Sequence, residues 1–148
     1  DGDTLVAIDN QGNEIKVRFA CIDAPEIPHT TAEKQSRKLV DKSQFSWGES
    51  AKERVEELIA QGNNNVVLNI TDTDRYGRKI SEVRLADGTF IQEVLLKEGL
   101  AQVYTQHLAN CPSSAIVTQA EAMAKGDQQG IWGDEKFVPA WDFRQNSK

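Results

Sequence analysis

Residues 1–22 predict two β-strands, because apolar and polar side chains alternate on both sides of the turn signal Asp9-Asn10-Gln11-Gly12. The second strand covers residues 15–22, and Pro25 stops it because proline cannot donate to a β-ladder. A strand of this kind turns alternate side chains to opposite faces. Its two faces hold Val17, Phe19 and Cys21 on one side and Lys16, Arg18 and Ala20 on the other.

Later segments change to a helical spacing and predict helices between further strands. Apolar residues at helical spacing follow Ser46-Trp47-Gly48-Glu49, which resembles a capping box, and Gly62 suits the end of that helix. Residues 89–99 and the segment after Pro112-Ser113-Ser114 predict two more helices. The last helix is expected to turn Ile116, Ala120, Met123 and Ala124 inward, and the remaining strands are expected at 66–70, 79–85 and 100–104.

Five short strands with interleaved helices predict one α+β domain, built on a closed barrel and spanning residues 1–148. Residues 27–45 are polar and Lys-rich, which predicts a surface loop. Residues 130–148 form an aromatic tail that we expect to pack back on the domain.

The net charge of −6 and the pI of about 4.9 argue against strong nonspecific binding to nucleic acid, which depends mostly on Lys and Arg. Any phosphate chemistry must then rely on a few placed cations and a metal. The apolar runs are too short to span a membrane, so we expect no membrane span in this segment.

The two cysteines, Cys21 and Cys111, lie far apart in the sequence, and neither belongs to a Cys-x-x-Cys pair. Only His29 and His107 could complete a zinc site with them, which disfavours one. Two free buried thiols and one long-range disulfide both remain open, and a disulfide would imply an oxidising compartment.

Candidate chemistry is concentrated in Asp3, Arg18, Asp23 and Glu26, with Arg78 further along in a polar turn. Carboxylates hold a hard cation, and arginines bind phosphate. A charge inside an apolar strand needs a partner or a ligand, and crowded carboxylates repel unless a cation or a proton relieves them. The structural alternatives are a surface salt bridge from Arg18 to Asp23 or Glu26 and an exposed turn with solvated charges around Arg78.

The chain resembles the thermonuclease (staphylococcal-nuclease-like) family over nearly its whole length. The resemblance implies an OB-fold barrel of five strands with three helices. It is carried by Asp1-Gly2-Asp3-Thr4, Arg18 to Glu26, Thr73 to Arg78, Ala86-Asp87-Gly88 and Glu98-Gly99-Leu100-Ala101.

The resemblance also implies roles for individual residues. Calcium would be held by the carboxylates of Asp3 and Asp23 and by the backbone carbonyl of Ala24, with Glu26 as the base. The remaining roles fall on Arg18 and Arg78 as phosphate-binding arginines, Arg75 and Tyr76 at a terminal phosphate, and Tyr104 near the base-stacking positions.

The function this implies is a calcium-dependent, sequence-nonspecific nuclease that hydrolyses DNA and RNA and leaves 3′-phosphate ends. The rival is a non-catalytic OB-fold module that binds nucleic acid or a protein partner. Such degenerate copies lose the acidic or arginine positions, whereas all five are present here. A purely structural calcium-binding domain would not explain two arginines that converge on the carboxylates.

Three further expectations follow. In the family a strand precedes the Asp-Gly-Asp-Thr turn, so we expect the polypeptide to extend upstream of Asp1 and to supply the first barrel strand. We expect a monomer. The possible Cys21–Cys111 bridge and the family's many exported members favour a secreted or periplasmic location.

Overall fold

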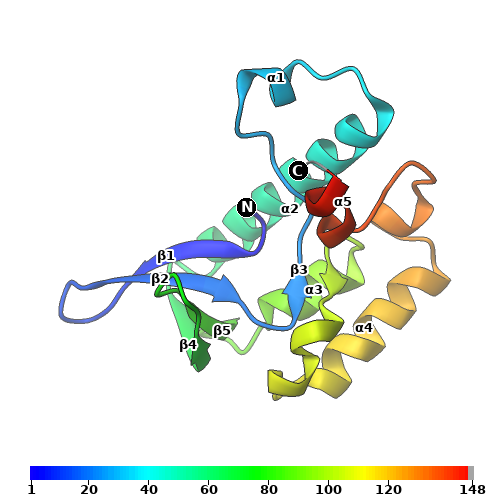
Figure 1. Ribbon diagram of the computed structural model, residues 1–148. Helices are drawn as coiled ribbons and strands as arrows, with labels where there is room; N and C mark the ends of the chain where they lie inside the picture. The colour runs from blue at the N-terminus through cyan, green and yellow to red at the C-terminus, as the bar shows by residue number, and fades with distance from the viewer. Residues whose placement is uncertain (147–148) are drawn as a thin grey trace.

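The computed structural model describes residues 1–146 and folds them into two small β-sheets covered by helices (Figure 1). In the larger sheet, in the order β1-β2-β5-β4, the outer pairs are antiparallel and β2 lies parallel to β5. The smaller sheet pairs β3 with β6. The strands are β1 (Thr4–Ile8), β2 (Glu14–Phe19), β3 (Ile22–Asp23), β4 (Val66–Thr73), β5 (Lys79–Leu85) and β6 (Gln102–Val103).

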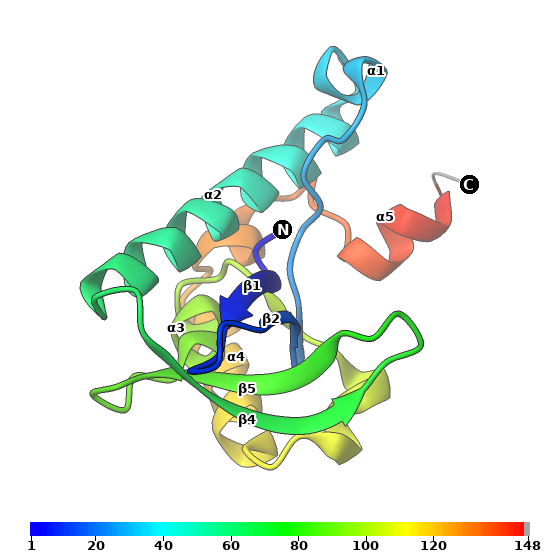
Figure 2. The same cartoon turned by 90° about the vertical axis from the view of Figure 1, so that its left-hand side faces the viewer.

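The long helix α2 extends from near α1 to the segment that leads into β4 (Figure 2). Helix α3 packs against α4. No helix in the described part of the chain is long and apolar enough to cross a membrane. The α-helices are α1 (Thr31–Lys34), α2 (Leu39–Gln61), α3 (Ile91–Lys97), α4 (Ser114–Gly126) and α5 (Ala140–Asn146), and the 3-10 helices are η1 (Thr105–Asn110) and η2 (Gly130–Gly133).

The mixed α+β architecture is confirmed, whereas a closed five-stranded barrel is not seen among residues 1–146. The strand expected over 15–22 ends at Phe19 because Cys21 has a φ of 76°, a left-handed conformation that turns the chain into β3. The strand expected over 100–104 is reduced to β6. Closure of the barrel, including the strand expected upstream of Asp1, stays a prediction.

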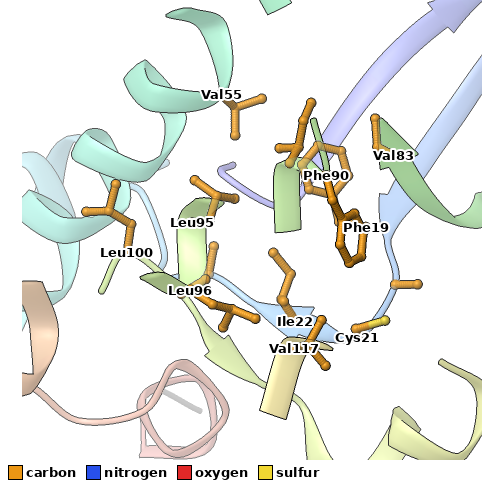
Figure 3. Close-up of a cluster of buried hydrophobic side chains, with 14 of the residues drawn as sticks. Phe19, Cys21, Ile22, Val55, Val83, Phe90, Leu95, Leu96, Leu100 and Val117 are labelled. Carbon is orange, nitrogen blue, oxygen red and sulfur yellow. The ribbon is translucent and has the colours of Figure 1, made fainter. Parts of the chain in front are cut away.

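The hydrophobic core lies where β2, β3 and β5 meet helices α2, α3 and α4 (Figure 3). Phe19, Ile22, Val83, Leu95 and Val117 are all almost fully buried there. Burying one such side chain stabilises a fold by about 1.5–3 kcal/mol. This core fixes the corner between β2 and β3, which carries the half-buried Arg18 and the buried Asp23.

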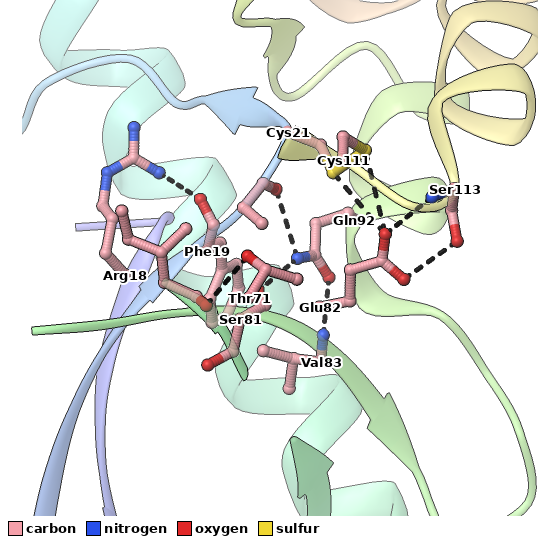
Figure 4. The surroundings of a disulfide bond; sticks show 12 residues. Arg18, Phe19, Cys21, Thr71, Ser81, Glu82, Val83, Gln92, Cys111 and Ser113 are labelled. Carbon is pink, nitrogen blue, oxygen red and sulfur yellow. Dashed lines mark hydrogen bonds between the residues drawn. A yellow bond between two sulfur atoms is a disulfide. The ribbon is translucent and has the colours of Figure 1, made fainter. Parts of the chain in front are cut away.

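A disulfide joins Cys21, at that corner, to Cys111, which precedes α4 (Figure 4). Beside it the buried Glu82 carboxylate accepts hydrogen bonds from the backbone N–H and the hydroxyl of Ser113 and from Arg84. The side chain of Gln92 completes the polar network of the corner: it donates to the carbonyls of Ala20 and Ser81 and accepts from the Val83 N–H. The corner is therefore tied both covalently and by satisfied buried polar groups.

The beginning of α2 lies earlier in the chain than the sequence pattern predicts. The helix begins at Leu39, so Ser46-Trp47-Gly48-Glu49 lies inside it and is not a capping box. Residues 27–45 are accordingly only partly a loop, because α1 and the first turns of α2 fall within them. The reason is burial: Phe45 packs edge-on against Phe143, with ring centroids 5.5 Å apart, so the first turns of α2 gain a tertiary partner.

Two other expectations concern the end of the chain. Helix α4 buries Val117, Ala120 and Ala124, whereas Ile116 and Met123 are exposed, which corrects their inward placement. The aromatic tail packs back through η2 and α5, with Ile131 and Phe143 buried. Residues 147–148 of the predicted 130–148 tail lie outside the described residues.

Asp134 holds this tail to α2. Its carboxylate accepts hydrogen bonds from the Ser43 hydroxyl at 2.7 Å and from the Trp47 indole N–H at 2.8 Å. These hydrogen bonds lower the pKa of the Asp134 carboxyl below its usual value.

Asp134→Ala should lower the free energy of unfolding by about 1–3 kcal/mol at neutral pH, because it leaves two donors without their acceptor. A depressed folded-state pKa contributes stability above the unfolded-state pKa, which is lost as the pH falls through the folded value. The difference between wild type and variant should therefore shrink below a pH of about 4. Urea unfolding at several pH values measures it, with the exposed neighbour variant Glu135→Ala as control. A difference that grows on acidification would contradict the prediction.

Candidate active site

The site residues singled out in the sequence, with the exception of Ala24, line one cleft of about 720 Å³. The cleft is open to solvent between the β2–β3 corner, the β4–β5 turn and the segment after β6. Its charged and aromatic lining residues include Asp1, Asp3, Arg18, Asp23, Glu26, Asp74, Arg75, Tyr76, Arg78, Tyr104, His107 and Arg144.

Arg18 lies between the two buried aspartates of the cleft. One of its guanidinium nitrogens is 3.6 Å from Asp3 Oδ2 and 3.7 Å from Asp23 Oδ1, and the other donates to the Phe19 carbonyl. The ion pair between Arg18 and Asp23, which was one structural alternative, is therefore present. It is not a surface pair, because the Arg18 side chain is 15% exposed and that of Asp23 only 1%.

Asp3 and Asp23 are buried side by side, which is costly for two carboxylates. Burial raises the pKa of the Asp23 carboxyl, and the charge of Asp3 adds to the rise, while Arg144 and Arg18 oppose it. Asp3 Oδ2 also accepts a hydrogen bond from the Ala24 N–H at 3.0 Å. The pair needs positive charge close by to stay ionised at neutral pH.

Arg144 on α5 supplies much of that charge, and sequence reasoning missed it. Its guanidinium donates to both oxygens of Asp23, at 3.1 and 2.8 Å, and to Glu26 Oε1 at 2.7 Å. Burial would lower the pKa of Arg144, but these hydrogen bonds raise it above its usual range. The sequence offers no local signal for this contact, because 121 positions separate Arg144 from Asp23.

A stripe of small and amide residues on α2 supports the acidic loops. Gln44, Gly48 and Ala51 follow one another at helical spacing along one face. The Gln44 amide accepts from the Glu26 N–H at 2.8 Å and donates to the Val138 carbonyl at 2.9 Å. A Cβ at Gly48 would collide with the carbonyl oxygen of Glu26, so only glycine permits this approach.

Arg78, Arg75 and Tyr76 lie on the β4–β5 turn at the rim of the cleft. Asp74 organises this turn by accepting from the backbone N–H groups of Tyr76 and Arg78 and from Arg78 Nε at 2.7 Å. Arg75 donates to the Tyr76 hydroxyl, and both guanidinium groups lie over the Tyr76 ring. The arginines are thus held in place but remain accessible at the edge of the cleft.

Tyr104 lines the same cleft with aromatic neighbours. Its ring is stacked on Trp141 of α5 at a centroid distance of 5.9 Å and meets His107 edge-on at 5.0 Å. One face of the ring expected near a nucleobase is therefore covered by α5.

The donor set suits a hard cation. The carboxylates of Asp3 and Asp23 and the Ala24 carbonyl are oxygen ligands of the kind calcium prefers. Asp1 also lines the cleft; its Oδ1 is buried without a hydrogen-bond partner in the described part of the chain and lies 3.9 Å from His29 Nε2.

Within residues 1–146, two side-chain groups each bring three potential ligand atoms within 4.8 Å of one another: Asp1, Glu26 and His29, and Cys21, Glu82 and Cys111. The sulfurs of the second group are joined in the disulfide, which removes them as thiolate ligands. The first group adjoins the cleft and adds oxygen ligands beside Asp3.

Comparisons with known proteins agree with the geometry. A family model described as "Staphylococcal nuclease homologue" matches residues 16–134. The chain is 34% identical over 139 residues to Endonuclease YncB of Bacillus subtilis, which covers 93% of the chain and 60% of that protein. It is 30% identical over 148 residues to an uncharacterized endonuclease of Haemophilus influenzae, which covers all of the chain and 70% of that protein.

A further relative is an uncharacterized endonuclease of Escherichia coli O157:H7, 29% identical over 144 residues, with 97% of the chain and 79% of that protein covered. The chain thus spans less than two thirds of YncB but more than two thirds of the other two relatives.

Gly48→Ala should destabilise the fold by about 1–3 kcal/mol, because the added methyl group drives the Glu26 backbone away from α2. In an ordinary helix interior the same change stabilises by up to about 1 kcal/mol, so the sign distinguishes the close approach. Gly126→Ala in α4 is the matched control, since a Cβ there meets nothing within 4 Å. Urea unfolding measures the energies, and amide exchange at Glu26 should accelerate. A Gly48 variant as stable as the control would contradict the role given to this contact.

Proposed function

The chain belongs to the staphylococcal nuclease family, and from that premise we propose that it is a calcium-dependent nuclease that hydrolyses phosphodiester bonds in DNA and RNA. The observation that carries the proposal is the convergence of Asp3, Asp23, Glu26 and Arg18 in one cleft, with Arg78 at its rim. The endonuclease names of the relatives agree with it.

Asp3, Asp23 and the Ala24 carbonyl would hold the calcium ion, which when bound would supply Lewis-acid polarisation of a phosphate oxygen. Glu26, held at its backbone by Gln44, would accept the proton of the attacking water. Arg18 and Arg78 would donate hydrogen bonds to the phosphate oxygens as charge develops on them. Cleavage that leaves a 3′-phosphate breaks the bond between phosphorus and the 5′ oxygen.

Substrate binding would use the rim of the cleft. Arg75 and Tyr76 would contact a terminal phosphate, and Tyr104 would stack on a base, as the family resemblance implies. Because the net charge is −6, we expect binding to nucleic acid to depend steeply on the cation. We also propose that the protein acts as a monomer outside the cytoplasm, where the Cys21–Cys111 disulfide would persist.

Glu26→Gln should reduce the hydrolysis of single-stranded DNA by about a hundredfold or more, because glutamine can accept the Arg144 hydrogen bond but not a proton. Chelation of calcium by EDTA should abolish hydrolysis of DNA and RNA by the wild type. Gel assays of end-labelled substrates, with end-group analysis, measure both effects. Full activity in EDTA would rule out the metal mechanism, and binding without cleavage in calcium would support the non-catalytic module instead.

Arg18→Lys and Arg78→Lys should each lower kcat by about a hundredfold, because an ammonium group cannot reproduce the planar fork of the guanidinium. Arg54→Lys is the matched control, since Arg54 pairs with Glu57 and Glu98. Steady-state kinetics at saturating calcium measure the effect. Equal losses in the control and in the site variants would show that the arginines act only through stability.

A further inference from the structure

Helix α5 places the Arg144 guanidinium against two of the three carboxylates of the site. It donates two hydrogen bonds to Asp23, in the two-pronged geometry that matches a guanidinium to a carboxylate, and one to Glu26. The contact is internal to the chain and connects residues far apart in sequence. It therefore depends on where α5 is packed.

A guanidinium in this position neutralises the charge of Asp23, as a bound metal ion would. The Asp23 side chain is 1% exposed and lies near Asp3, so it needs a cation. Both of its oxygens are already hydrogen-bonded to Arg144. A divalent ion on the same oxygens would be repelled by the guanidinium at short range, so the two cations compete.

The same contact also engages Glu26. Its Oε1 accepts the shortest of the three Arg144 hydrogen bonds, at 2.7 Å. An oxygen that is held in this way is not available to accept a proton from water in the same direction. The observed arrangement thus occupies both oxygens of Asp23 and one oxygen of Glu26 with the guanidinium of Arg144.

Helix α5 is a short element at the end of the described residues. It is seven residues long and buries Ala140 and Phe143, and its aromatic contacts include Phe143 edge-on to Phe45 and Trp141 stacked on Tyr104. The Arg144 side chain is 39% exposed even while it is paired. Displacing α5 would free both the carboxylates and one face of Tyr104.

We propose that Arg144 is a tethered counter-cation, which neutralises Asp23 and Glu26 when no divalent ion is bound and is displaced, with α5, when calcium binds. The choice of calcium rests on the proposed function. Withdrawal of Trp141 from Tyr104 then opens a stacking surface for a base, so metal binding and substrate access are coupled. The apparent calcium affinity is then the intrinsic affinity multiplied by the fraction of molecules in which α5 is open.

Arg144→Gln removes the competing charge, so its Kd for calcium should be about tenfold lower than that of the wild type or lower still. Isothermal titration calorimetry with calcium alone measures it, without substrate. Arg54→Gln is the matched control, because it removes another ion-paired arginine outside the cleft. An unchanged or weakened calcium affinity in Arg144→Gln would overturn the proposal.

Hydrogen exchange of the wild type gives a second readout, which does not depend on how a substitution affects folding. Adding calcium should accelerate exchange of the amides in residues 140–146 while it slows exchange around Asp3 and Asp23. Ligand binding that simply rigidified the domain would slow both regions, and that result would overturn the proposal. The opposite signs are specific to displacement of α5.

These measurements separate the proposal from the nuclease function. Cleavage in calcium, combined with equal affinities of Arg144→Gln and wild type, would reject the counter-cation and leave the nuclease intact. A tighter Arg144→Gln with accelerated exchange in α5, but without cleavage of DNA or RNA, would support the counter-cation and reject the nuclease. Absence of calcium binding in all variants would reject both.

Discussion

The requirement that buried negative charge be compensated organises this molecule. Asp3 and Asp23 are almost completely buried, and two carboxylates in that position are unfavourable without cations nearby. Arg18 reaches both from β2, and Arg144 reaches Asp23 from the other end of the chain. Because each arginine comes from a different element, the β2–β3 corner and α5 must be held together for the charges to balance.

The backbone of α2 makes that assembly possible. Gly48 allows the Glu26 segment to approach the helix, and Gln44 hydrogen-bonds both that segment and Val138, which leads to α5. A glycine in a helix interior costs about 1 kcal/mol relative to alanine. Gly48 allows Glu26 to take its position in the site. This gain explains a residue that is unfavourable in the interior of a helix.

The sequence predicted those parts of the site that depend on local pattern. A charge inside an otherwise apolar strand singled out Arg18, and two carboxylates crowded at the strand exit singled out Asp23 and Glu26. Contacts between distant segments left no such signal, so the role of Arg144 and the beginning of α2 at Leu39 were missed. Ser46-Trp47-Gly48-Glu49 was misinterpreted for the same reason: Trp47 binds Asp134, and Gly48 serves a close approach, neither of which is visible within four residues.

The acidity of the protein makes the position of its arginines important for binding phosphate. A surface with a net charge of −6 repels phosphate, so attraction has to be created at the cleft itself. Arg75 and Arg78 are held at its rim over the Tyr76 ring, while Arg18 and Arg144 are committed to carboxylates inside. A divalent ion bound to those carboxylates would neutralise them in place of the guanidinium groups. The guanidinium groups would then be free to bind phosphate groups of the substrate. The metal would raise the potential of the cleft by its own charge, and the guanidinium groups would add direct contacts, so an acidic protein could bind a polyanion through a small number of groups.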